Sequence, residues 1–305
     1  MPLTFPFLKL PILVQLLIIQ KLNLCQLFDF SLISRKSKEI AKSLELKIEK
    51  LVWKFDDRFK SHQLDLINGL SAFHVKIPTQ SYYQQTPFGD NKSLSLARVH
   101  YNDVSGFWII RGQGSTDKSL LDISRYLLEI VRADKLEFEG DNVKDLVGCP
   151  VWKVTRSLDS LMLISHSTTG FLSSRDLIFA LTNLSVNHFS LFCELERGFK
   201  YTGPLRMKTL TTTFPDFLTL QSLLNMECKQ VFFTRGSRLT ASDKNLNTIL
   251  KHWIAGKGLK NLEKIHIDMP DGCDFRMQRI LEGVQTFPWD PKNRSECWQG
   301  LGVKG

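Results

Sequence analysis

The sequence lacks the residue patterns that hold metal ions or link segments covalently. Its six cysteines are scattered over 305 residues, with no Cys-x-x-Cys pair and no tight clustering with histidine: Cys25, Cys149, Cys193, Cys228, Cys273 and Cys297. This scatter excludes the usual zinc spacings and a disulfide framework. We therefore expect a reducing compartment, cytoplasmic or nuclear, and a protein without a metal or other cofactor.

Catalytic patterns are missing as well. The seven histidines include no pair at metal-ligand spacing on a helix. Ser165 precedes His166, but adjacent side chains rarely point the same way and no Gly-x-Ser-x-Gly turn surrounds them. Residues 111–116 contain two glycines but lack the third glycine and the Lys-Ser/Thr pair of a phosphate loop. Ser115 or Asp117 is therefore interpreted as the N-cap of a helix. We predict that the protein is not an enzyme.

No apolar run reaches the ~20 residues that a membrane-spanning helix needs. Residues 12–19 with Lys9 as a basic flank are one candidate for a secretory signal, but Pro11 heads the run. Gln15 and Gln20 interrupt it, and no small-residue cleavage site follows. We expect no membrane association.

The net charge of +9 is a possible sign of nucleic-acid binding. Residues 1 to 60 hold 11 lysines and arginines against 6 acidic residues, and the remaining 245 hold 29 against 25. The basic residues between 35 and 50 alternate with Glu39, Glu45 and Glu49, as on a solvated helix face. No nucleic acid is expected, although a basic nucleic-acid- or protein-binding scaffold is kept as the alternative function.

The N-terminal 50 residues predict a small helical unit. Pro11 suits the first turn of a helix, and apolar residues then recur at three- and four-residue spacing through residue 25. This pattern predicts a buried helix, and residues 27–40 predict two shorter ones. Because such a unit is small for an independent core, it should pack on the rest of the chain or on a partner.

Alternating apolar residues then indicate short, antiparallel strands over residues 46–112, with a polar loop at 79–91. From Leu136 onward, strands and helices alternate at irregular spacing, which is typical of degenerate leucine-rich repeats or of an ordinary α/β or α+β layer. The clearest unit has a strand at 230–233, a helix at 245–254 with Thr240 or Ser242 as its cap, and a strand ending at Ile267.

The N-terminal pattern resembles the F-box. It begins with Leu10-Pro11, continues with Ile18-Ile19-x-x-Leu22, and has Leu27 at the start of the second helix, followed by Leu32-Ile33-Ser34-Arg35-Lys36. The sequence departs from the F-box pattern at four positions. Acidic residues are replaced by Leu13 and Leu17, an Asp-Pro pair by Asn23-Leu24, and a tryptophan by Ser37.

A second pattern lies within residues 218–267 and consists of four segments, Leu220-x-x-Leu223-Leu224, Leu239-Thr240, Leu246-Asn247-x-x-Leu250-Lys251-His252-Trp253-Ile254 and Leu262-Glu263. This pattern resembles the type 2 F-box-associated domain of the large nematode F-box family.

The two resemblances imply a substrate receptor of an SCF-type ubiquitin ligase, which bridges the ligase adaptor, and through it a cullin, to an unknown target protein. The adaptor-binding positions would be Leu10, Pro11, Val14, Ile18, Leu22 and Leu27, with an intramolecular core role as the alternative for each. The fold class expected is α+β: a three-helix F-box-like module at 5–50, then a target-recruiting region of short strands and leucine-rich-repeat-like units at 51–290. Residues 291–305 are expected to form a loose tail.

Overall fold

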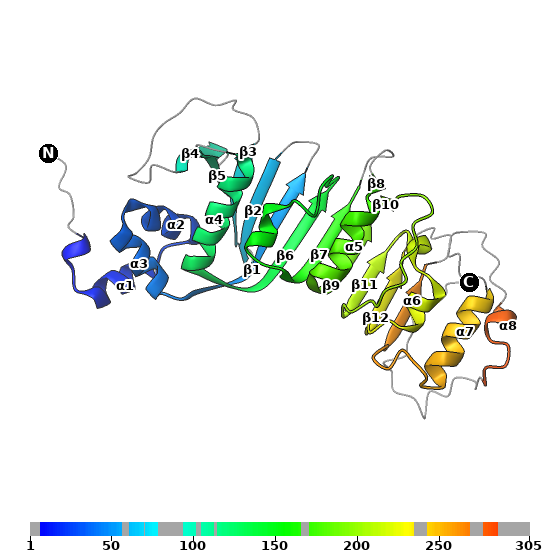
Figure 1. Ribbon diagram of the computed structural model, residues 1–305. Helices are drawn as coiled ribbons and strands as arrows, with labels where there is room; N and C mark the ends of the chain where they lie inside the picture. The colour runs from blue at the N-terminus through cyan, green and yellow to red at the C-terminus, as the bar shows by residue number, and fades with distance from the viewer. Residues whose placement is uncertain are drawn as a thin grey trace.

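The computed structural model describes residues 7–56, 61–69, 71–78, 94–101, 105–112, 115–165, 171–234, 243–268 and 277–285. A helical segment lies at one end of the molecule, and the strands stand side by side from there to helix α7 at the other end (Figure 1). The polar loop at 79–91, His166, the expected caps at 240 and 242, and the tail at 291–305 lie outside the described residues.

The helical end contains one 3-10 turn and three helices: η1 (Phe7–Lys9), α1 (Ile12–Ile19), α2 (Leu24–Ile33) and α3 (Arg35–Ser43). Local hydrogen bonds fix where α2 and α3 begin. Asn23 and Gln26 form a reciprocal capping box at the start of α2, and the Ser34 hydroxyl accepts a hydrogen bond from the Ser37 N–H at the start of α3. The three helices expected from the sequence are present.

Eleven strands of the described chain form one sheet in the order β13-β12-β11-β9-β7-β6-β1-β2-β3-β5-β4. Its first part contains antiparallel pairs β1–β2, β2–β3 and β4–β5, with β3 and β5 parallel. These strands are β1 (Leu46–Asp56), β2 (Ser61–Asn68), β3 (Ser71–Pro78), β4 (Leu94–Tyr101) and β5 (Ser105–Gly112). The strands expected over residues 46–112 are present, but not all are antiparallel as expected, because β3 pairs with β5 in parallel.

Helix α4 (Thr116–Ile130) connects β5 to β6 (Val131–Asp141), which returns to pair in parallel with β1. Its N-cap is Ser115, whose hydroxyl accepts from the Lys118 N–H. A buried hydrogen bond of 2.9 Å from Trp53 Nε1 to Ser124 Oγ joins β1 to α4. The N-cap interpretation of Ser115 is thus confirmed.

The second part of the sheet is parallel throughout, because each strand from β6 to β13 pairs in parallel with its neighbour. Its strands are β7 (Ser157–Ile164), β9 (Ser185–Phe192), β11 (Thr209–Thr212), β12 (Gln230–Phe233) and β13 (Lys264–Ile267). The connections contain η2 (Pro150–Lys153), α5 (Ser174–Asn183), η3 (Pro215–Phe217), α6 (Leu220–Leu224) and α7 (Asp243–Ile254), with α8 (Met277–Ile280) beyond β13. The short strands β8 (Phe171–Leu172) and β10 (Glu194–Leu195) pair separately.

Helices α4, α5, α6 and α7 lie on the same side of the sheet (Figure 1). Large side chains that alternate along the strands, among them Phe138, Leu161 and Phe189, are buried on that side. The fold is therefore a mixed α+β arrangement with N-terminal helices followed by strands.

Helix α2 packs into the hydrophobic core of the sheet through Phe28. Phe28 of α2 is 1% exposed and contacts the rings of Phe73 and Tyr126, at centroid distances of 5.3 Å and 5.9 Å. The Tyr126 hydroxyl donates to Ser31 Oγ, at 2.9 Å. In addition, β1 begins at Leu46, so the expected boundary at residue 50 falls inside a central strand.

Candidate functional site

Helix α1 exposes several large apolar side chains. Leu13 is 71% exposed, Leu17 is 63% exposed and Ile12 is 53% exposed. Leu8 on the preceding turn and Ile33 at the end of α2 are exposed as well. Contiguous apolar patches of this kind mark sites where proteins bind one another.

Only one side of α1 packs on the rest of the helical end. Ile19 is buried in a small core with Leu27, Ile40 and Ala41. Gln15 is also buried, and its Nε2 donates to the Leu10 carbonyl at 2.6 Å, which ties the helix to the turn before it. The sequence pattern predicted a buried helix, and this was wrong for the Leu13–Leu17 side because nothing in the described chain covers it.

The six predicted adaptor-binding residues fall into two groups. Pro11, Val14 and Ile18 are exposed, so a partner can reach them. Leu10 and Leu22 are half-buried, and Leu27 is 2% exposed inside the small core. The apolar surface of α1 is therefore formed by Pro11, Val14 and Ile18 together with the residues that sequence reasoning left out, Ile12, Leu13 and Leu17. The spacing of these residues could have indicated the exposed side. Leu13 and Leu17 are four residues apart and so share one side of a helix, and Ile18 follows Leu17.

The four departures from the F-box pattern have different surroundings. Leu13 and Leu17 are exposed on α1, where they enlarge the apolar surface. Leu24 is half-buried and packs against the main core. Ser37 is 1% exposed, and its hydroxyl lies 2.9 Å from the Ser34 hydroxyl. Only Leu13 and Leu17 therefore change what a partner would contact.

A second cluster of functional groups lies on the side of the sheet opposite the helices. Lys54 Nζ on β1 lies 3.0 Å from Asp65 Oδ2 on β2 and 3.3 Å from Glu139 Oε2 on β6. Asp65 Oδ1 also lies 2.6 Å from His74 Nδ1 on β3 and 2.6 Å from Gln63 Nε2. Side chains from three strands therefore meet at the Asp65 carboxylate, which is 2% exposed, and Lys54 joins this group to Glu139 on a fourth strand.

The ionisation of this cluster follows from its contacts. Burial by itself raises the pKa of Asp65, but hydrogen bonds from His74, Gln63 and Lys54 outweigh it and hold the pKa below its usual range. Burial by itself would lower the pKa of Lys54. The contacts of Lys54 with Asp65 and Glu139 outweigh the effect of burial, so the pKa lies above its usual value. Both groups are charged at neutral pH, so the cluster is an ion-pair network.

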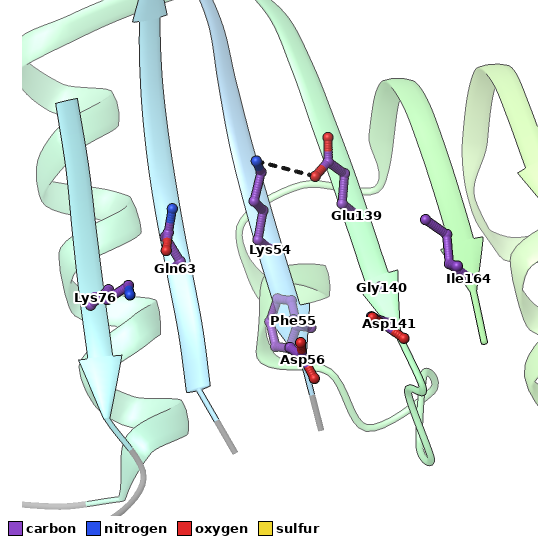
Figure 2. A pocket seen from close by; sticks show the side chains of 9 residues that line it. All are labelled: Lys54, Phe55, Asp56, Gln63, Lys76, Glu139, Gly140, Asp141 and Ile164. Carbon is purple, nitrogen blue, oxygen red and sulfur yellow. Dashed lines mark ion pairs between the residues drawn. The ribbon is translucent and has the colours of Figure 1, made fainter. Parts of the chain in front are cut away.

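A hollow of about 650 Å³ opens on this side of the sheet beside the ion-pair network. Figure 2 shows Lys54 and Glu139 at one end and Asp56 and Asp141 at the other. The lining side chains come from five neighbouring strands, and they are Lys54, Phe55, Asp56, Gln63, Lys76, Glu139, Asp141 and Ile164, with Gly140 contributing backbone.

Few side chains in the described residues have the reactivity or the clustering that catalysis or metal binding requires. Burial raises the pKa of the Cys193 and Cys228 thiols to about 12, so they stay protonated and unreactive at neutral pH. No group of three or more histidine, cysteine or acidic side chains in the described ranges could hold a metal ion. None of the helices described here combines the length and the apolar character needed to cross a membrane.

Comparison with known protein families finds two matching segments in the chain. Residues 7–49 match the F-box domain, and residues 201–267 match the F-box associated domain. The F-box match covers η1 and the helices α1 to α3, and the second match covers the strands β11 to β13 with α6 and α7. Searches of curated proteins and of solved structures found no match.

The two domains agree with the sequence-based resemblances. F-box domains bind the adaptor subunit of SCF complexes and, through it, the cullin. Both families are adaptor-type domains without catalytic activity. An F-box followed by an F-box-associated domain fits a substrate-receptor adaptor of an SCF ubiquitin ligase.

Proposed function

We propose that this protein is the substrate receptor of an SCF-type ubiquitin ligase and that it performs no chemistry itself. The F-box domain binds the adaptor through α1, and the sheet recruits a target protein for ubiquitination. The observation that carries this proposal is the exposed apolar surface of α1 inside the segment that matches the F-box domain.

The adaptor contact is centred on Leu13, Leu17 and Ile18. Covering such side chains removes apolar surface from water, which contributes about 1.5–3 kcal/mol for each side chain that becomes fully buried. A few anchors of this kind supply most of the affinity of a protein interface. Three of the six residues predicted from the sequence contact the adaptor directly: Pro11, Val14 and Ile18. The other three hold α1 in place by packing inside the helical end: Leu10, Leu22 and Leu27.

The target-recruiting region extends over the strands from residue 51 to residue 290. In this region each parallel strand and its connection form one leucine-rich-repeat-like unit, which buries its apolar side against the next unit. Phe28 of the F-box segment packs in the core of the sheet, so the adaptor and the target are held at a fixed separation. The protein acts in the cytoplasm or nucleus, where its cysteines remain reduced.

Adaptor binding by the full chain tests the proposal. The double variant Val14→Asp with Ile18→Asp places two charges on α1, where both side chains are exposed. The adaptor affinity is expected to fall at least about a hundredfold, because two apolar contacts are lost and two charges are desolvated. Titration of the purified chain with purified adaptor measures this.

The matched control is Ile178→Asp on α5, because Ile178 is 43% exposed and Ile18 is 41% exposed. This variant should bind the adaptor like the original chain. If the α1 variant keeps its adaptor affinity while the thermal unfolding of all three proteins is the same, the proposed function is wrong.

A further inference from the structure

Positive charge is concentrated in the segment that matches the F-box associated domain. Residues 201–267 hold 10 lysines and arginines against 4 acidic residues, so this segment carries +6 of the net charge of +9. Residues 61–200, which precede it, hold 14 lysines and arginines against 15 acidic residues. The excess of positive charge therefore distinguishes the F-box-associated segment from the strands before it.

The fold gathers six of these cations at one edge of the sheet, where the strands β11, β12 and β13 begin. Lys208 directly precedes β11, Lys229 directly precedes β12, and Lys264 is the first residue of β13. The three amino ends are adjacent, because Thr209 is in register with Gln230, and Gln230 is in register with Lys264. We call the exposed cations of these strand ends and of the loop between α7 and β13 the basic edge: Arg206, Lys208, Lys229, Lys257, Lys260 and Lys264.

Hydrogen bonds hold the loops of the basic edge together. The Lys229 N–H donates to the Lys208 carbonyl at 2.8 Å, and the Glu263 N–H donates to the Lys229 carbonyl at 2.7 Å. Asn261 Nδ2 in the loop between α7 and β13 donates to the Glu227 carbonyl before β12, at 3.3 Å. The loops that carry the six cations are therefore tied to one another.

Acidic side chains neutralise only part of the charge of the basic edge. Arg206 Nε lies 3.7 Å from Glu227 Oε1, and Lys229 Nζ lies 3.0 Å from Glu263 Oε1. No carboxylate of the described residues pairs with the other four cations, which are Lys208, Lys257, Lys260 and Lys264. A ligand that complements this edge is therefore an anion.

The surroundings of these cations favour the carboxylates of a protein over the phosphates of a nucleic acid. The side chains of Glu227 and Glu263 are 56% and 57% exposed within the edge, and they would repel a continuous chain of phosphates that crosses it. Residues 203–209, 227–230 and 255–264 contain no aromatic side chain on which a base could stack. A peptide can instead place its carboxylates at individual lysines.

Strand spacing sets the separation of these carboxylates. Neighbouring strands lie about 4.8 Å apart, so Lys208 before β11 and Lys264 in β13 are about 10 Å apart. An extended segment that crosses the three strands covers this distance in about three residues. Acidic residues three positions apart can therefore reach both lysines at once.

We propose that the basic edge binds an acidic segment of the target protein, in which aspartates or glutamates lie about three positions apart. The carboxylates bind Lys208 and Lys264, and the cations of the loop after α7 attract the rest of the segment. The basic edge lies at the opposite end of the molecule from α1, so the adaptor and the target can bind at the same time (Figure 1). That the segment belongs to a protein marked for ubiquitination rests on the proposed function; binding of an acidic segment does not.

Three probes test this with the full chain. The first is a peptide with four glutamates spaced three positions apart, the second has glutamines in place of the glutamates, and the third is a short single strand of DNA with the same number of charges. Fluorescence anisotropy should show the glutamate peptide binding at least about tenfold more tightly than either of the others, and more weakly as salt is raised.

Charge reversal locates the contact. Lys208→Glu with Lys264→Glu should weaken binding of the glutamate peptide at least about tenfold. The matched control is Lys135→Glu with Lys153→Glu, which changes the net charge equally at two exposed lysines, on β6 and η2. This control should lose less than about twofold, because salt screens charges that lie far from the peptide. If thermal unfolding shows that the edge variant does not fold, Lys208→Gln with Lys264→Gln removes the same cations and should lose about threefold.

Four results would overturn the proposal. They are equal binding of the glutamine peptide, unchanged affinity in the folded edge variant, an equal loss in the control variant, or tighter binding of the DNA strand that the edge variant abolishes. The last result would make the basic edge a nucleic-acid surface. Adaptor affinity is measured in parallel on each variant. Normal adaptor binding without peptide binding refutes the acidic-segment site alone, and the reverse result refutes the adaptor contact alone.

Discussion

Two surfaces of this protein depart in opposite ways from the rule that apolar side chains lie inside and charges outside. Helix α1 exposes Leu13 and Leu17 and buries Gln15. The helix-free side of the sheet, which we call the open face, instead buries Asp65 and half-covers Lys54. The apolar side chains of α1 contribute little to the fold, so they can serve a partner. The charges of the open face join four strands, so they stabilise the fold.

The largest expected effect on stability comes from Phe28, through which α2 packs into the core of the sheet. Phe28→Ala should lower the free energy of unfolding by about 3–5 kcal/mol, because it removes a ring that packs on Phe73 and Tyr126. Urea unfolding measures the change. Phe28→Leu is the control and should cost less than about 1.5 kcal/mol, since it keeps most of the volume.

If the F-box domain were an independent unit, Phe28→Ala would unfold it and leave the sheet intact. The urea unfolding curve of the variant would then show two transitions. Such a curve would contradict the coupling between the helical end and the sheet.

An intermediate effect is expected at the open face. Asp65→Asn should cost about 2 kcal/mol, because a charged hydrogen-bond acceptor shared by His74, Gln63 and Lys54 is lost. The control is Glu263→Gln, whose exposed pair with Lys229 at 3.0 Å should contribute almost nothing. Thermal unfolding of both variants measures the difference.

The effect of Asp65 should depend on pH in one direction. The folded pKa of Asp65 lies below the unfolded value of 3.8, so its contribution is complete above that value and disappears as the pH falls through the folded pKa. The original chain should therefore lose stability more steeply than Asp65→Asn below about pH 4. Parallel acid profiles would contradict the ion-pair assignment.

The smallest effect is expected on α1. Leu13→Ser with Leu17→Ser should change the free energy of unfolding by less than about 0.5 kcal/mol, because both side chains are exposed in the folded chain. Chemical unfolding without adaptor measures this. A loss above about 1 kcal/mol would mean that another part of the chain covers α1, and the contrast with the open face would disappear.

Local elements were largely predictable, because they depend on neighbours in the sequence. The strand expected at 230–233 is β12, and the helix expected at 245–254 lies within α7. Capping by Ser115 followed from the chemistry of one side chain. The boundary expected at residue 50 lies inside β1, which pairs with β6 some 85 residues later in the sequence, and no local pattern indicates that pairing.

The binding surfaces were less predictable for the same reason. Asp56 precedes another aspartate in the sequence and has no recognisable motif around it, yet it lies at the end of β1 and lines the hollow. The ion-pair network joins Lys54, Asp65, His74 and Glu139 from four strands, and no spacing in the sequence indicates that they meet. Leu13 and Leu17 were noted only as departures from a motif.

By itself the sequence determined the helices at the N-terminus, the strands, the Ser115 cap of α4 and the resemblance to two domain families. These features rest on spacing and on local hydrogen bonds, which act over a few residues. Only the tertiary structure decided which apolar residues remain exposed and which charges are buried, because burial depends on strand pairing between distant segments. It thereby separated α1, whose outer side stays uncovered, from the open face, where four strands bring their charges together.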